Sequence, residues 1–174
     1  MIIRDAKPDD AVLLTMIAHA AKRSWGYPES WIAAWSHMLT LRAEYLAQHP
    51  TFVACENESA LGFAVIDLRG DLASLEHLWV RPERKRTGIG RLLFEYCEAF
   101  ARGAGVDILM IESDPHAEEF YRRMGAVRYD ERSADIDGTK RTLPLLKKYL
   151  KSRRTGPGIC YSLSGLNSAW CYTG

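Results

Sequence analysis

A basic, glycine-containing turn at residues 82–90 is the stretch best suited to chemistry. It carries Arg84, Lys85 and Arg86 before two glycines spaced Gly88-x-Gly90, and Arg91 follows directly. Glycine lets an anion approach the backbone without meeting a Cβ atom. The first turn of a helix adds unpaired N–H groups and partial positive charge. The spacing predicts a polyphosphate site, with an ordinary solvated turn as the alternative.

The segments on either side would position this turn. Residues 75–80 are apolar and aromatic and predict a strand that ends before Pro82. After the turn, apolar residues recur at helical spacing and predict an amphipathic helix, with Ile89, Leu92, Leu93, Tyr96, Cys97 and Phe100 on one face. The sequence holds neither Gly-x-x-x-x-Gly-Lys-Ser/Thr nor Gly-x-Gly-x-x-Gly after the strand, so two common nucleotide-binding motifs are absent.

The rest of the chain predicts a mixture of strands and helices. Strands are expected at 2–4, 51–56, 60–68, 106–112, from 126 and at 142–150, and helices at 8–23, 29–47 and 115–124. The strand–helix–strand unit across 75–112 predicts a parallel, right-handed crossover. Residues 131–139 read as a polar loop, and Pro144 confines the last strand to an edge or a bulge.

Composition limits the class of protein. The chain has 174 residues and a net charge of +1, which gives no reason to expect nucleic acid or a membrane as partner. We expect one domain at 1–150 and an extension at 151–174, where Ser, Gly and Thr are frequent. The N-terminus lacks the apolar region of a signal peptide, so a cytoplasmic location is expected. The four cysteines show no metal-ligand spacing, and no metal is expected.

Two segments resemble motifs of the GNAT acetyltransferase superfamily. Val80-x-Pro82-x-x-Lys85-Arg86-Thr87-Gly88-Ile89-Gly90 is similar to the family's acyl-CoA-binding motif V-x-P-x-x-R/Q-G-x-G-x-G/A. The later segment 114–126, which reads D-x-x-A-x-x-F-Y-x-x-x-G-A, resembles the family's N-x-x-A-x-x-F-Y-x-x-x-G-F. Both occur in the family's order with a predicted strand between them, and the resemblance ends near residue 150.

This resemblance implies a fold and a binding mode. It implies an α+β (α/β/α) GNAT fold, whose mixed central sheet of about six or seven strands splays between its fourth and fifth strands to hold acetyl-CoA, with flanking helices. The backbone near Leu78, Trp79 and Val80 would hold the pantetheine and polarise the thioester. The implied cofactor contacts continue through Lys85, Arg86, Thr87, Gly88, Ile89, Gly90 and Asp114.

The resemblance also implies catalytic roles. Tyr121 matches the tyrosine that protonates the departing CoA thiolate. Glu76 lies where many relatives place the base that deprotonates the amine, with His77 or a water molecule as alternatives. Period-two alternation places Glu76 on one strand face with Leu78, and a β-bulge would shift that phase.

Three positions depart from the family pattern. Lys85 stands at the Arg/Gln position, and Arg86 replaces the first glycine, where a left-handed dihedral would cost about 1 kcal/mol or more. Asp114 stands where Asn is usual, and an ionised carboxylate accepts hydrogen bonds but donates none. Helix capping is therefore the alternative to a cofactor contact for Asp114.

The implied function is N-acetylation. The enzyme would transfer an acetyl group from acetyl-CoA to a primary amine of a small molecule by direct attack in a ternary complex. Trp25, Tyr27 and Trp31 would form the acceptor pocket, or serve only as packing anchors. A non-catalytic acyl-CoA-binding module with the same fold is the alternative, and the sequence leaves dimerisation open. Binding of nucleic acid to the basic turn is disfavoured by the near-neutral total charge.

Overall fold

Seven strands form one mixed sheet in the order β1-β2-β3-β4-β5-β7-β6. The computed structural model describes residues 1–150. β1 to β4 pair antiparallel, β4 and β5 pair in parallel, and β7 pairs antiparallel with both β5 and β6. The strands are β1 (Ile2–Asp5), β2 (Thr51–Glu56), β3 (Ser59–Arg69), β4 (Leu72–Val80), β5 (Ile108–Glu112), β6 (Val127–Ile136) and β7 (Thr139–Tyr149).

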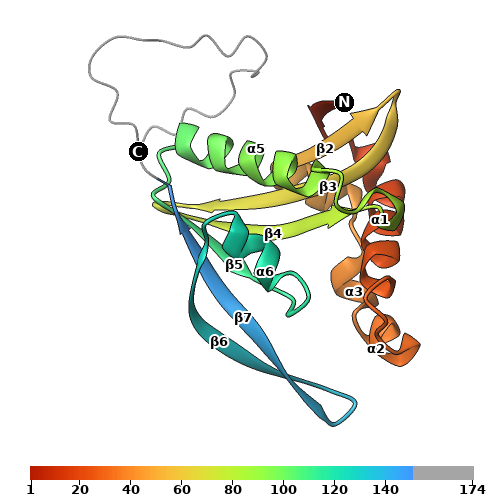
Figure 1. The fold of residues 1–174 in the computed structure, drawn as a ribbon. Helices are drawn as coiled ribbons and strands as arrows, with labels where there is room; N and C mark the ends of the chain where they lie inside the picture. Colours follow the sequence, from red (N-terminus) through yellow and green to blue (C-terminus); the bar gives the residue numbers. More distant parts are fainter. Residues whose placement is uncertain (151–174) are drawn as a thin grey trace, which may run out of the picture.

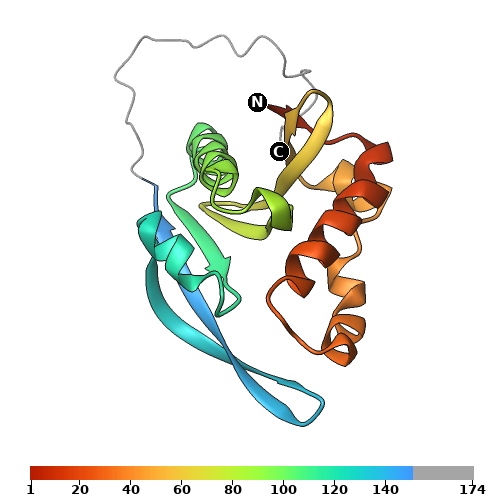
Figure 2. The ribbon, with the colours of Figure 1, turned by 45° about the vertical axis from the view of Figure 1, so that its right-hand side comes forward.

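Helices cover both faces of this sheet. Figure 2 shows α5 and α1 on opposite sides of β2 to β4. The helices are η1 (Pro8–Asp10), α1 (Ala11–Arg23), α2 (Glu29–Ala34), α3 (Ser36–Leu39), α4 (Ala43–Gln48), η2 (Pro82–Arg84), α5 (Ile89–Gly103) and α6 (Glu118–Arg123) (Figure 1). The predicted crossover is confirmed, because α5 connects the parallel strands β4 and β5.

Strand alternation divides the core into two clusters. Phe52 and Ala54 of β2 pack on the α5 side, whereas Val53 and Cys55 between and after them pack on the α1 side. Cys97 of α5 is fully buried in the first cluster, which agrees with its position on the predicted apolar stripe. The helices therefore cover the central strands from both faces.

The predicted splay between the fourth and fifth strands is confirmed. β4 pairs with β5 only from Leu72 to Leu75. The next residue, Glu76, is the extra residue of a β-bulge, since Val65 of β3 pairs with His77 while Ile66 pairs with Leu75. A bulge increases local twist and bends its strand. β4 therefore leaves β5 at Glu76.

Two predictions about secondary structure were wrong. The single helix expected at 29–47 is three short helices, α2, α3 and α4. The loop expected at 131–139 is part of a long hairpin in which β6 runs to Ile136 and turns at Asp137-Gly138, both with positive φ (Figure 1). Most of β6 is exposed, so it has no apolar alternation that could reveal a strand in the sequence.

Pro144 was expected at an edge or a bulge. The edge is wrong, whereas a register shift in β6 between Arg128 and Asp130 lies next to its partner Glu131. β7 is not an edge strand, because it lies between β5 and β6. Register pairing with β5 ends at Leu145, and the strand partner of Pro144 is Glu131 of β6. Its carbonyl accepts a hydrogen bond from the Ser113 N–H at 2.8 Å. A missing N–H is tolerated there because β5 needs no donor at that position.

Within residues 1–150, no helix has the length and apolar character needed to cross a membrane. The same residues hold no group of three or more His, Cys, Asp or Glu arranged to bind a metal ion. The extension predicted at 151–174 lies outside the described residues.

Candidate active site

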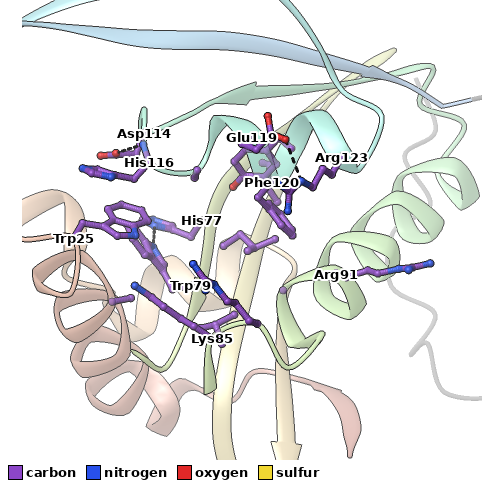
Figure 3. Close-up of a pocket in the computed structure, with 18 of the residues that line it drawn as sticks. Trp25, His77, Trp79, Lys85, Arg91, Asp114, His116, Glu119, Phe120 and Arg123 are labelled. Carbon is purple, nitrogen blue, oxygen red and sulfur yellow. Dashed lines mark hydrogen bonds and ion pairs between the residues drawn. The ribbon is translucent and has the colours of Figure 1, made fainter. Parts of the chain in front are cut away.

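A cavity of about 810 Å³ opens where β4 separates from β5. Figure 3 shows its wall, which is built from β4, the basic turn, the end of β5 and α6. It brings together most of the residues predicted from the sequence: Trp25, Glu76, Leu78, Trp79, Val80, Lys85, Arg86, Gly88, Gly90, Asp114 and Tyr121.

Four predicted residues do not line this cavity. Ile89 is the first residue of α5 and is buried in the core. The Thr87 hydroxyl donates a hydrogen bond to the Arg84 carbonyl at 2.7 Å. Tyr27 and Trp31 are partly buried against the α1 cluster and stack on each other with ring centroids 5.8 Å apart. The Thr87 and Ile89 side chains therefore contribute structure to the turn, and Tyr27 and Trp31 form a second layer behind the cavity wall.

The turn before α5 presents unused backbone donors. The first N–H of α5 that hydrogen-bonds within the chain is that of Leu92, to the Gly88 carbonyl at 3.0 Å. No hydrogen bond within residues 1–150 uses the N–H groups of 86–91. Gly88 has φ +89° and Arg86 has φ +62°, so Arg86 adopts the left-handed conformation that is unfavourable for a residue with a Cβ atom. A Cβ atom at Gly90 would meet nothing closer than Phe120 at 3.6 Å.

The open edge of β4 adds further donors. The Arg81 N–H bonds the Leu61 carbonyl at 2.9 Å, and hydrogen-bonded pairs alternate in an antiparallel ladder. Trp79 and His77 therefore direct their backbone groups toward β3. Leu78 and Val80 direct theirs toward the side from which β5 has departed. Glycine is required opposite this segment, because a Cβ atom at Gly62 would lie 2.6 Å from the Trp79 carbonyl oxygen.

Tyr121 brings a phenol to the cavity from α6. It is 7% exposed and packs against Phe94 and Phe120, with ring centroids at 5.8 and 5.0 Å. Burial raises the pKa of Tyr121 well above its usual value. Its hydroxyl bonds no other side chain or backbone group in the described part of the chain. The side chain is therefore a neutral proton donor with its O–H available.

Glu76 and His77 differ in their suitability as bases. Glu76 lines the cavity at the bulge, and its nearest cation is Arg69 Nη2 at 4.0 Å. His77 Nδ1 accepts a hydrogen bond from Trp79 Nε1 at 3.1 Å, and burial lowers the pKa of His77 to about 4. As the alternation predicted, the side chains of His77 and Trp79 lie on the strand face opposite that of Leu78. The geometry leaves Glu76 as the more accessible acceptor of a proton.

Asp114 is the centre of a buried polar cluster. Its Oδ2 accepts from Lys22 Nζ at 2.6 Å and from Arg141 Nη2 at 3.0 Å. Its Oδ1 accepts from Tyr27 Oη at 2.8 Å and from the His116 N–H at 3.0 Å. Burial opposes ionisation, but the Lys22 charge and these hydrogen bonds give a net lowering of the pKa of Asp114.

The predicted cap at Asp114 is displaced from the helix. α6 begins at Glu118 with Ala117 as its N-cap, so Asp114 caps only the turn that precedes the helix. Three residues of this region were not predicted as site residues: Lys22, Arg141 and His116. The His116 ring stacks on Trp25, with centroids 5.7 Å apart. One signal was present for Lys22: it follows Ala18 by four positions and so continues the buried face of α1.

Comparison with known proteins identifies the family. Residues 14–126 match the model of the acetyltransferase (GNAT) family, which is more than half of the chain. The chain belongs to this family, and the acyltransferase class follows from it. No curated protein gives a significant match.

Solved structures share the fold. A GCN5-related N-acetyltransferase from Rhodopseudomonas palustris is 24% identical, with a TM-score of 0.69 over 86% of this chain and 95% of that chain. The PaiA N-acetyltransferase of Thermoplasma acidophilum, solved with coenzyme A, is 19% identical, with a TM-score of 0.67 over 85% and 98%. YncA of Salmonella typhimurium, solved with acetyl-CoA, is 20% identical, with a TM-score of 0.65 over 92% and 99%.

Proposed function

We propose that this protein transfers an acetyl group from acetyl-CoA to a primary amine of a small molecule by direct attack in a ternary complex. One observation carries the proposal: the cavity at the β4–β5 separation combines unused backbone donors with the neutral phenol of Tyr121. Two relatives of the same fold were solved with coenzyme A or acetyl-CoA, which supports the cofactor.

The turn before α5 fits a pyrophosphate. Backbone N–H groups at 86–91 are free of partners among the described residues, and they lie at the positive end of the α5 dipole. Gly88 and Gly90 leave the approach to these groups unobstructed by Cβ atoms. The charges of Arg86 and Arg91 lie on the same stretch of the wall. We therefore assign the phosphates to this turn.

Acetyl-CoA supplies the activated thioester when it is bound. The N–H groups of Leu78 and Val80 are the donors available to negative charge that develops on the thioester oxygen. Tyr121 donates a proton to the departing thiolate, and its buried environment keeps that proton on the phenol at neutral pH. Glu76 accepts the proton of the attacking amine, directly or through a water molecule.

A pair of glycine variants tests the cofactor site. Gly90→Ala adds a methyl group at the cradle without strain, because its neighbours would lie at 3.6 Å or beyond. Gly103→Ala adds the same group at the other end of α5, where nothing lies within 4 Å. Titration calorimetry with acetyl-CoA should show at least about tenfold weaker binding for Gly90→Ala, since lost charge-assisted hydrogen bonds are worth 1.5 kcal/mol or more. Gly103→Ala should bind as the parent does.

Equal affinity of Gly90→Ala and Gly103→Ala for acetyl-CoA would contradict the assignment of the phosphates to this turn. The alternative, a non-catalytic acyl-CoA-binding module, predicts tight binding with no acetyl transfer to any amine in a broad panel. Transfer measured as CoA release separates the two functions. The cytoplasmic location stays a prediction from the sequence. Whether the protein forms a homodimer stays open.

A further inference from the structure

The cavity has two chemically different ends. In Figure 3, Arg91 lies at the α5 end, whereas Trp25, Asp114 and His116 lie together at the other end, beside α1. The proposed function assigns the α5 end to phosphates and the middle, at Leu78 and Tyr121, to the thioester. The end at Trp25, Asp114 and His116 is therefore where an acceptor must enter, and we refer to it as the acceptor end.

Positive charge exceeds negative charge at the acceptor end. Lys22 and Arg141 lie directly behind the wall, each with a side chain about one-tenth exposed, and Asp114 is the only carboxylate that pairs with either in residues 1–150. Lys85 lies on the wall itself, with its Nζ 5.7 Å from the centre of the Trp25 ring. It forms no ion pair with any acid in the same residues and hydrogen-bonds Ser24. Three cations thus accompany one carboxylate at this end. The other carboxylates that line the cavity, Glu76, Glu112 and Glu119, each lie within 4.0 Å of an arginine of their own.

Asp114 cannot serve a substrate cation. Its two oxygens already accept four hydrogen bonds, from Lys22, Arg141, Tyr27 and the His116 N–H. A carboxylate has about four lone-pair sites, so this acceptor capacity is filled. An ammonium group that approached here would meet excess positive charge and no free acceptor on Asp114.

Arg141 retains unused donors. Only its Nη2 is engaged, by Asp114 and by the Tyr27 hydroxyl, and no described residue accepts from Nε or Nη1. The guanidinium lies against the rings of Tyr27 and Trp35, at 5.0 and 4.6 Å. These contacts hold its charge in a region of low dielectric, where attraction to an anion is stronger than in water. Burial, and in part Arg141, also lowers the pKa of Lys22.

We infer that the acceptor carries a carboxylate beside its amine, so that amino-acid-like molecules, and not polyamines, are the substrate class. The inference rests on the proposed function. A carboxylate at the acceptor end offsets the surplus charge of Lys22, Arg141 and Lys85. A polyamine adds positive charge to an end that already has a surplus, and it offers nothing to the unused guanidinium donors.

A ligand-binding experiment tests the inferred substrate class without requiring acetyl transfer. The intrinsic fluorescence of Trp25 and its neighbours is titrated with each common L-amino acid, its carboxamide, and spermidine, with and without CoA. At least one amino acid should bind about tenfold more tightly than its amide, which has the same side chain and amine but no carboxylate charge. Preference for amides or spermidine, or no binding of any amino acid, would overturn the inference.

Two variants at neighbouring positions locate the effect. Arg141→Gln removes the charge behind Asp114 and should weaken binding of the preferred amino acid about tenfold while leaving its amide unchanged. Lys140→Gln removes the same charge from the exposed adjacent position of β7 and should change neither. Equal effects of the two variants on the amino acid would contradict the assignment. If Arg141→Gln does not fold, Lys85→Gln is titrated in its place.

A CoA titration of the same samples keeps the two proposals separate. Failure to bind CoA with retained carboxylate preference removes the acetyltransferase proposal and leaves the carboxylate site. Normal CoA binding and transfer to amines with no carboxylate preference removes the inference and leaves the acetyltransferase proposal. For Lys85→Gln, weaker CoA binding with unchanged amino-acid binding would assign that charge to a phosphate.

Discussion

Lys22 Nζ lies 2.6 Å from Asp114 Oδ2, although the two residues are 92 positions apart in the chain. Arg141 reaches the same oxygen at 3.0 Å from β7. This contact joins the end of α1, the loop between β5 and α6, and the β6–β7 hairpin. The acceptor end of the cavity therefore depends on one carboxylate for its shape.

Asp114→Asn should destabilise the fold strongly. All four groups that contact the Asp114 oxygens are donors, so an amide NH2 at either oxygen position faces a donor and leaves buried charge uncompensated. Breaking a buried ion pair by removing one partner costs about 3–5 kcal/mol. Urea denaturation at pH 7 measures the loss. This geometry also explains why Asp stands where the family motif has Asn.

Glu119→Gln is the control for Asp114→Asn. Glu119 pairs with Arg123 on the exposed surface of α6, where such a pair contributes about 0.5 kcal/mol or less.

The contribution of Asp114 to stability should depend on pH. The pKa of Asp114 is lowered in the fold, so its stabilising contribution is present above the pKa of the unfolded carboxyl and is lost as pH falls through the folded pKa. The difference between parent and Asp114→Asn should therefore shrink below about pH 4. Similar losses in Asp114→Asn and Glu119→Gln would contradict the central role of Asp114.

Tyr121→Phe should reduce kcat with little effect on stability. The hydroxyl bonds no described group, so its removal breaks no internal hydrogen bond. Loss of a general acid lowers kcat about 10²- to 10⁴-fold. Steady-state CoA release gives kcat, and calorimetry with acetyl-CoA should show unchanged affinity. A normal kcat would exclude Tyr121 as the proton donor.

The sequence predicted the parts of the site that depend on local pattern. Gly88 and Gly90 precede an apolar stripe with helical period, so the position of the turn before α5 follows from neighbouring residues alone. The β4 alternation of Leu78 and Trp79 is equally local. Tyr121 was predicted in another way, because the segment 114–126 resembles a family motif in which this tyrosine has a catalytic role.

The features of the site that were not predicted from the sequence depend on contacts between distant segments. Arg141 lies in a polar stretch that shows no strand period, and only its pairing across the hairpin brings it to Asp114. The same absence of alternation concealed β6. The family resemblance left a β-bulge in this strand open, but its position at Glu76 depends on the register against β3, which a single strand's sequence does not encode. Trp31 was expected either in the acceptor pocket or as a packing anchor, and it packs against the α1 cluster.

Glu76→Gln should lower kcat and preserve acetyl-CoA binding, because the amide cannot accept the proton of the amine. Glu112→Gln is the matched control: Glu112 also lines the cavity, but Arg132 engages both of its oxygens. We expect at least about a hundredfold loss of kcat for Glu76→Gln and a far smaller one for Glu112→Gln. Equal kcat values for the two variants would exclude Glu76 and leave His77 or a water molecule as the base.

His77 should make stability, and not catalysis, depend on pH. Burial lowers its pKa to about 4, below the usual value of 6.5, so the folded state keeps the imidazole neutral while the unfolded state binds a proton. Its contribution is fully present above pH 6.5 and is lost as pH falls from there to about 4, a shift equivalent to ~3 kcal/mol. Urea denaturation of parent and His77→Gln at intervals from pH 4 to pH 8 measures this difference.

The His77→Gln variant keeps an acceptor for Trp79 Nε1, so the position of the indole on the cavity wall is preserved. Its stability should fall less steeply than that of the parent between pH 6.5 and 4, because glutamine does not titrate. The pH profile of kcat/KM should be the same for both proteins above pH 6, where His77 is neutral in the folded state. An acidic limb that is present in the parent profile and disappears in His77→Gln would instead identify His77 as the base.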